Sequence, residues 1–179
     1  MEIIRCIFIL VFGTLGHFIF EWSGHRRWAG MLFAVNESTW EHIKLTIYPS
    51  FFWAIGEGIA TGFDAGLVVS CFASTAVMMA LIPALFYGYT AITGKNWLIT
   101  DIICFILAIV GGGFTDIFVK GLPSLPTFPT VISICGLAAV LAAYLTFSYN
   151  PPHNFLFRDP ISKGFGPTGH DCHSHFHGV

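Results

Sequence analysis

The sequence predicts an all-α fold, a polytopic transmembrane bundle of about five spans. Of its 179 residues, 55% are hydrophobic and only 10% are charged, whereas a soluble domain carries roughly 25% charged residues. Apolar runs of about 20 residues recur along the chain, and each is long enough to cross a hydrocarbon core of about 30 Å. We therefore expect a membrane-embedded domain over residues 1–155 and a cytoplasmic polar tail over residues 156–179.

The first expected span covers residues 3–22. Its apolar run is long and no small-residue cleavage site follows it, which favours a retained helix over a signal peptide. Gly13, His17 and Glu21 recur every four residues and give this helix a polar stripe. The apolar segment that follows, residues 29–35, is too short to cross a membrane and is expected at the interface.

The second expected span, residues 40–59, carries an unusual share of the polar residues. Ser38 and Glu41 have the spacing of a capping box, which predicts that a helix begins here. Pro49 lies inside the span and is expected to kink it. A polar stripe in an otherwise apolar helix normally faces protein and not lipid. On an ideal helix that stripe consists of His42, Thr46, Ser50, Trp53 and Glu57.

Three further spans are expected after a short glycine-containing turn. They cover residues 67–91, 97–119 and 130–149. Pro83 predicts a kink in the third span of the chain. The run of glycines at positions 111–113 in the fourth span permits either a close helix approach or a broken helix.

The distribution of lysine and arginine predicts the orientation, because cytoplasmic loops are enriched in both. Two basic residues, Arg5 and Lys120, fall on one side of the predicted topology. The other side holds Arg26, Arg27, Lys44, Lys95, Arg158 and Lys163. We therefore expect a multi-pass cell-membrane protein with its N-terminus outside and its C-terminus in the cytoplasm.

Four ionisable residues at the predicted inner ends of the first two spans form the main candidate site. His17, Glu21, Glu41 and His42 are of the types that bind zinc, nickel, copper or iron. We expect them to face one another or a shared polar cavity, with Asp101 nearby. The alternative is a salt-bridged network of the two glutamates with Lys44, Arg26 or Arg27 at the membrane surface.

Three acidic residues suggest an ion pathway: Asp101 near the predicted inner end of its span, and Glu57 and Asp116 toward the predicted outer side. A charge at the bilayer centre costs at least roughly 2.5–3.5 kcal/mol. Such residues must therefore pair with a cation, bind one, or line water.

The C-terminal stretch forms a second candidate metal site. It holds His170, Cys172, His173, His175 and His177. Alternate residues of an extended strand point the same way, so three of these imidazoles and a thiol could hold a soft or borderline divalent ion. The alternative is a His-rich polar tail with no bound metal.

The remaining composition narrows the classes of function. The net charge is −2 and there is no basic block, so nucleic-acid binding is not expected. The cysteines are scattered singly and the serines in the spans have no adjacent histidine, so neither a disulfide framework nor a nucleophilic catalytic residue is predicted.

Three sequence segments carry a resemblance to a known family. They are GHFIFEWSG at residues 16–24, NESTWEHIKL at 36–45 and FRDPISKGFG at 157–166. On these segments the chain resembles an uncharacterised family of small prokaryotic multi-pass membrane proteins, a domain of unknown function. The resemblance implies a membrane protein and implies no activity.

Three functions remain open from the sequence. One is passage or binding of a proton or divalent metal ion through the His/Glu cluster. Another is a metal-dependent membrane enzyme, with a carboxylate as general base beside a metal-bound water. The last is a structural accessory subunit of a membrane complex. The expected partners are the lipid bilayer and either further copies of the chain or a larger membrane complex.

Overall fold

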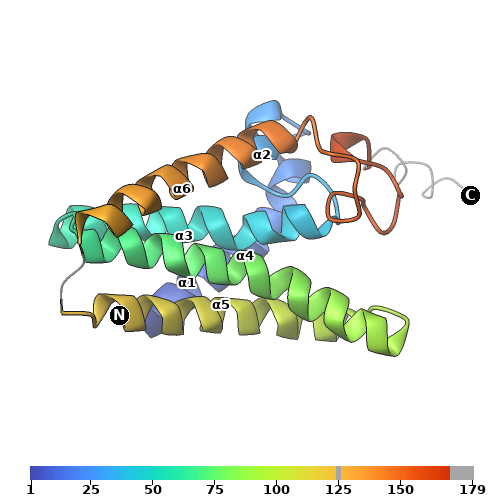
Figure 1. Ribbon diagram of the computed structural model, residues 1–179. Helices are drawn as coiled ribbons and strands as arrows, with labels where there is room; N and C mark the ends of the chain where they lie inside the picture. The colour runs from blue at the N-terminus through green and yellow to red at the C-terminus, as the bar shows by residue number, and fades with distance from the viewer. Residues whose placement is uncertain (124–125, 170–179) are drawn as a thin grey trace, which may run out of the picture.

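The computed structural model describes residues 1–123 and 126–169, and over these residues the protein is a bundle of helices (Figure 1). The α-helices are α1 (Glu2–Trp22), α2 (Arg27–Leu32), α3 (Thr39–Thr61), α4 (Ala65–Thr93), α5 (Leu98–Lys120) and α6 (Thr127–Phe147). A short 3-10 helix, Gly166–Gly169, follows. The predicted all-α transmembrane fold is confirmed.

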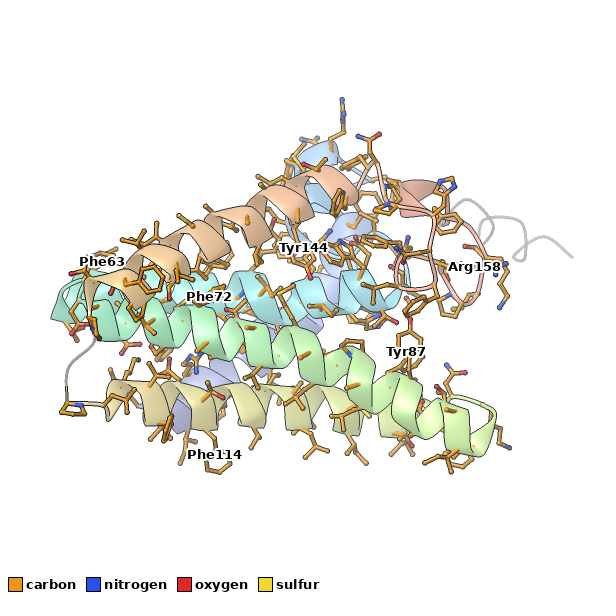
Figure 2. The ribbon with its side chains drawn as sticks, in the orientation of Figure 1. Phe63, Phe72, Tyr87, Phe114, Tyr144 and Arg158 are labelled. Carbon is orange, nitrogen blue, oxygen red and sulfur yellow. The ribbon has the colours of Figure 1, made fainter. Side chains whose placement is uncertain are left out.

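Each long helix runs in the opposite direction to the long helix before it, from one end of the bundle to the other (Figure 1). Four of them, α1, α4, α5 and α6, are long and apolar enough to cross a membrane. The fifth, α3, is less apolar, and most of its first half is buried. It packs against α1 and α4, so protein shields the polar side chains that lower its hydropathy. The side chain of Phe114 instead projects outward from α5 (Figure 2).

Glycines allow the helices to approach one another closely. A Cβ on Gly112 of α5 would lie 2.7 Å from Met78 Cγ of α4, so only glycine fits without a shift. A Cβ on Gly13 of α1 would lie 2.5 Å from the Leu45 carbonyl oxygen of α3. Pro49 has no N–H to offer that carbonyl, and α3 continues through the proline. Of the two alternatives at the glycine run, the close approach is therefore present, and α5 is unbroken there.

An aromatic core lies between α3 and α6 and extends to the segment after α6. The Trp40 ring stacks on Tyr144 with centroids 4.2 Å apart and contacts Phe157 at 4.6 Å. The backbone N–H of Trp40 donates to the Leu156 carbonyl (3.0 Å), and Asn36 Nδ2 donates to the Gly166 carbonyl (2.9 Å). The described part of the C-terminal segment therefore packs on the end of the bundle where α3 begins.

Candidate functional site

Two histidines and a glutamate meet at the end of the bundle where α1 ends and α3 begins. His17 Nε2 lies 3.2 Å from Glu37 Oε1, and His42 Nε2 lies 3.6 Å from Glu37 Oε2. One ligand atom from each residue lies within 4.8 Å of the other two, and all three side chains are half-buried. We call His17, Glu37 and His42 the His–Glu–His centre.

The turn before α3 holds Glu37 in this position. Asn36 Oδ1 accepts a hydrogen bond from Ser38 N–H (2.9 Å), and Ser38 Oγ accepts one from Glu41 N–H (3.4 Å). Ser38 is the N-cap of α3, as the capping-box spacing predicts. With the residues on both sides of Glu37 fixed, its carboxylate is presented to the two imidazoles.

The tautomer of His42 follows from its second ring nitrogen. Its Nδ1 lies 3.0 Å from the Ser38 carbonyl oxygen, which can only accept, so Nδ1 carries a proton. Neutral His42 then has a bare lone pair on Nε2, the atom that faces the Glu37 carboxylate. Two acceptors that face each other repel, so a second proton or a cation between them is required.

The spacing of the donor atoms fits a small metal ion. Ligands about 2.0 Å from a tetrahedral zinc ion lie about 3.3 Å from one another, close to the 3.2 and 3.6 Å that separate Glu37 from the two histidines. The contact from His42 to Ser38 is also of the kind that orients a metal-bound imidazole. Nδ1 of His17 is buried and has no hydrogen-bond partner among the described residues.

Glu41 lies in a different network, although the sequence placed it with His17 and His42. Its Oε2 is 2.6 Å from Lys44 Nζ and accepts from Val35 N–H (3.1 Å). Lys44 is completely buried. Its ammonium also donates to Ser148 Oγ and to the carbonyl oxygens of Gly30 and Phe33, at 2.6, 3.0 and 3.2 Å. This contact set ties α2 and α6 to α3, and part of the expected salt-bridge alternative is thus present.

The expected set of four is therefore only half assembled. His17 and His42 come together, with ring centroids 5.5 Å apart. Glu41 points into the Lys44 network, and Glu21 is exposed at the end of α1 outside the centre. Glu37 takes the place of the carboxylate that we expected from Glu21 or Glu41. The sequence pattern did not single out Glu37 as a ligand, although it lies only five residues before His42.

Asp101 is not part of the centre, but it lines a cavity that Glu37 and His42 also line. It accepts a hydrogen bond from the Tyr89 hydroxyl. The cavity has a volume of about 330 Å³, and Glu37 and His42 line it together with Asp101. Its apolar walls come largely from Ile82, Phe86, Leu98 and Phe105.

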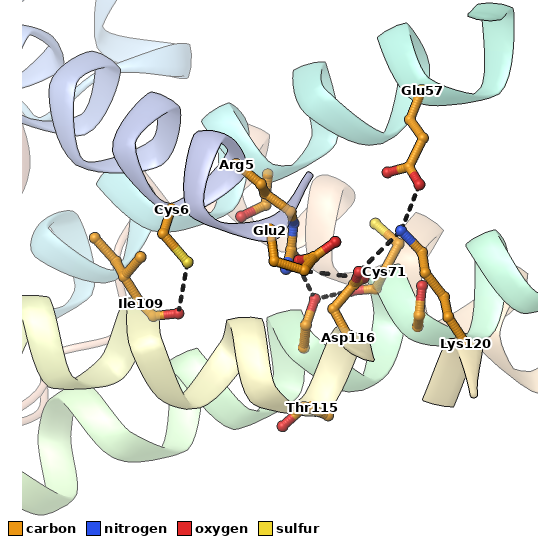
Figure 3. Close-up of polar contacts among 12 residues, drawn as sticks. Glu2, Arg5, Cys6, Glu57, Cys71, Ile109, Thr115, Asp116 and Lys120 are labelled. Carbon is orange, nitrogen blue, oxygen red and sulfur yellow. Dashed lines mark hydrogen bonds and ion pairs between the residues drawn. The ribbon is translucent and has the colours of Figure 1, made fainter. Parts of the chain in front are cut away.

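The other two residues of the expected ion pathway lie at the opposite end of the bundle, in a network of ion pairs (Figure 3). Lys120 Nζ is 2.6 Å from Glu57 Oε1 and 2.8 Å from Asp116 Oδ2. Arg5, which is 3% exposed, lies 3.8 Å from Asp116 and 3.4 Å from Glu2, and donates to Ser74 Oγ. The lysine and the arginine thus provide cations for the buried Asp116 and for the half-buried Glu57 and Glu2.

The His-rich candidate site cannot be placed. Its residues, His170, Cys172, His173, His175 and His177, lie outside the described residues.

A family model matches residues 2–167 and therefore includes all three residues of the His–Glu–His centre. It describes a family of unknown function, DUF6512. The chain belongs to this family. The family description assigns no activity to DUF6512. No curated protein and no solved structure matches this chain.

Proposed function

We propose that this DUF6512 protein is an integral membrane protein that binds a divalent transition-metal ion through His17, Glu37 and His42. One observation carries the proposal. His42 Nε2 faces one carboxylate oxygen of Glu37 at 3.6 Å, and His17 Nε2 lies 3.2 Å from the other carboxylate oxygen; in the neutral His42 tautomer with a proton on Nδ1, the Nε2 lone pair points at the carboxylate. A divalent cation among these atoms turns mutual repulsion into coordination.

The types of donor atom limit which metal ions the centre would bind. Two imidazoles and one carboxylate suit zinc and ferrous iron, and nickel is also accepted by such ligands. Three protein ligands leave at least one coordination position for water or substrate, as in catalytic zinc sites. Because Glu37 and His42 also line the cavity, we place that open position toward the cavity.

This cavity favours a metal-dependent enzyme as the second candidate function. A metal-bound water at the open position would supply a nucleophile at neutral pH. Asp101 lines the same cavity and is the carboxylate available there as a general base. A metal-conducting path has less support, because Glu57 and Asp116 are already paired with Lys120.

Metal analysis of the purified full-length protein tests the proposal. We expect His17→Gln and His42→Gln each to lose about one metal ion per chain, because a three-ligand site seldom survives with two. His153→Gln is the matched control, since His153 is an exposed histidine that stacks on Phe165 outside the centre. Metal content that is the same in all three variants and in wild type would refute the proposal.

A further inference from the structure

We infer that the cavity beside the His–Glu–His centre binds an amphipathic molecule drawn from the membrane. Its head would carry an oxygen anion, a carboxylate or a phosphate, and its alkyl body would lie along α4 and α5. This inference rests on the proposed function, because the bound metal is what the head would coordinate.

The walls of the cavity have the two chemistries that such a ligand needs. Glu37 and His42, at the start of α3, supply the metal-binding side. Ile82 and Phe86 of α4 and Phe105 of α5 supply an apolar wall. The volume of about 330 Å³ is at the lower end of the range for small-molecule sites, which combine mostly apolar walls with a few convergent polar groups.

The cavity borders the apolar exterior of the bundle. Leu98 lines it at the first turn of α5 and is 75% exposed. The helix that carries Leu98 is apolar enough to cross a membrane, so this exposed surface faces lipid or the membrane interface. An amphiphile could therefore enter sideways from the bilayer with its head first, so that its chain leaves the bilayer last.

The charges near the cavity favour an anionic head. A second pocket shares Thr39, Phe86 and Pro160 with the cavity. Its charged lining residues are two cations, Arg158 and Lys163, and one carboxylate, Asp159, so cations outnumber anions there. Both cations are exposed, and Arg158 lies at this end of the bundle (Figure 2). Exposed cations attract anions toward the surface that carries them. Within the cavity, a bound divalent metal would offset the charges of Glu37 and Asp101, and an anionic oxygen would be a suitable further ligand for it.

The experiment uses a photoreactive fatty acid and the full-length, zinc-loaded protein in detergent. Labelled positions are mapped by mass spectrometry, and we expect them to fall on residues that line the cavity. Leu98→Trp should lower labelling about tenfold, because the larger side chain fills the mouth of the cavity. Ile99→Trp is the matched control, since Ile99 is equally exposed (74%) but is not one of the cavity-lining residues. We expect the probe to label Ile99→Trp as strongly as it labels wild type.

Competition separates an amphiphile from its head group alone. Unlabelled decanoate should displace the probe, whereas acetate at the same concentration should not. A chelator that strips the zinc should also lower labelling, because the head then loses its ligand. Equal labelling of Leu98→Trp and wild type, or equal displacement by acetate and decanoate, would overturn the inference.

The zinc content of the same samples keeps the two proposals apart. Leu98→Trp with unchanged zinc and reduced labelling supports the amphiphile site. Unchanged zinc with unchanged labelling overturns the amphiphile site and leaves the metal centre standing. Wild-type protein that takes up no zinc contradicts the metal centre itself.

Discussion

The Nε2 atom of His42 lies 3.6 Å from a carboxylate oxygen of Glu37, while the Nδ1 atom of the same ring contacts the Ser38 carbonyl at 3.0 Å. The turn that begins α3 thus fixes both the carboxylate and the tautomer of the imidazole that faces it. His17, on α1, completes the group from a second helix. The centre therefore depends on the packing of α1 against α3.

Glu37→Gln tests the carboxylate of the centre. The substitution keeps the shape of the side chain and removes its charge. We expect metal affinity to fall at least about 10–100-fold, since even outer residues of metal sites have effects of that size. Isothermal titration calorimetry with zinc measures this affinity. Glu21→Gln, an exposed carboxylate one turn from His17 on α1, should bind as wild type does. A weaker loss in Glu37→Gln than in Glu21→Gln would contradict the assignment.

Glu41→Gln should affect stability and not metal content. It leaves the completely buried Lys44 without its counter-ion, which is 2.6 Å away in the wild type. Breaking a buried pair in this way costs about 3–5 kcal/mol, so thermal unfolding in detergent should occur at a markedly lower temperature. The double variant Glu41→Leu with Lys44→Met removes both charges and should recover much of the loss. A single variant that is as stable as wild type would show that the pair is dispensable.

Gly13→Ala tests the contact between α1 and α3. The new Cβ would lie 2.5 Å from the Leu45 carbonyl oxygen, and overpacking of this kind typically costs about 1–3 kcal/mol. We also expect weaker metal binding, because the shift separates His17 from Glu37 and His42. Gly56→Ala is the control, since a Cβ at Gly56 of α3 meets nothing within 4 Å. Equal thermal stability of the two variants would contradict the close approach.

Reporter fusions test the orientation in the membrane. The positive-inside bias predicts a cytoplasmic signal from a fusion after Lys95 and from a fusion at the C-terminus. Both positions follow helices that end at the same end of the bundle, α4 and α6 (Figure 1). An external signal from the C-terminal fusion would overturn the predicted topology.

Removal of residues 168–179 tests the His-rich tail independently of the centre. The truncated protein keeps Gly166, whose carbonyl accepts from Asn36, so we expect it to stay folded in detergent. Its content of zinc, nickel or copper should fall while the ion bound at the centre remains. If metal content is unchanged after truncation, the tail does not bind metal.

The sequence by itself determined the membrane class, the long helices and their approximate bounds. These properties depend on local composition, because any run of about 20 apolar residues can cross a bilayer. It also indicated the N-cap at Ser38, because a cap depends on residue types within one turn. The glycine run left a close approach and a broken helix both open, and only the packing of α5 against α4 decided between them. The lower hydropathy of α3 and the four polar residues at the inner ends were visible in the same way.

Only the tertiary structure decided which carboxylate joins the two histidines. Glu41 and His42 are adjacent on α3 and diverge by about 100°, so the rotation of α3 against its neighbours selects one of them to face α1. In the packed bundle Glu41 contacts Lys44, and Glu37 is the carboxylate that lies beside His42. In the same way, the pairing of Glu57 and Asp116 with Lys120 joins α3 to α5. Contacts between residues so far apart in the sequence depend on how whole helices pack, and no local pattern of residues specifies that.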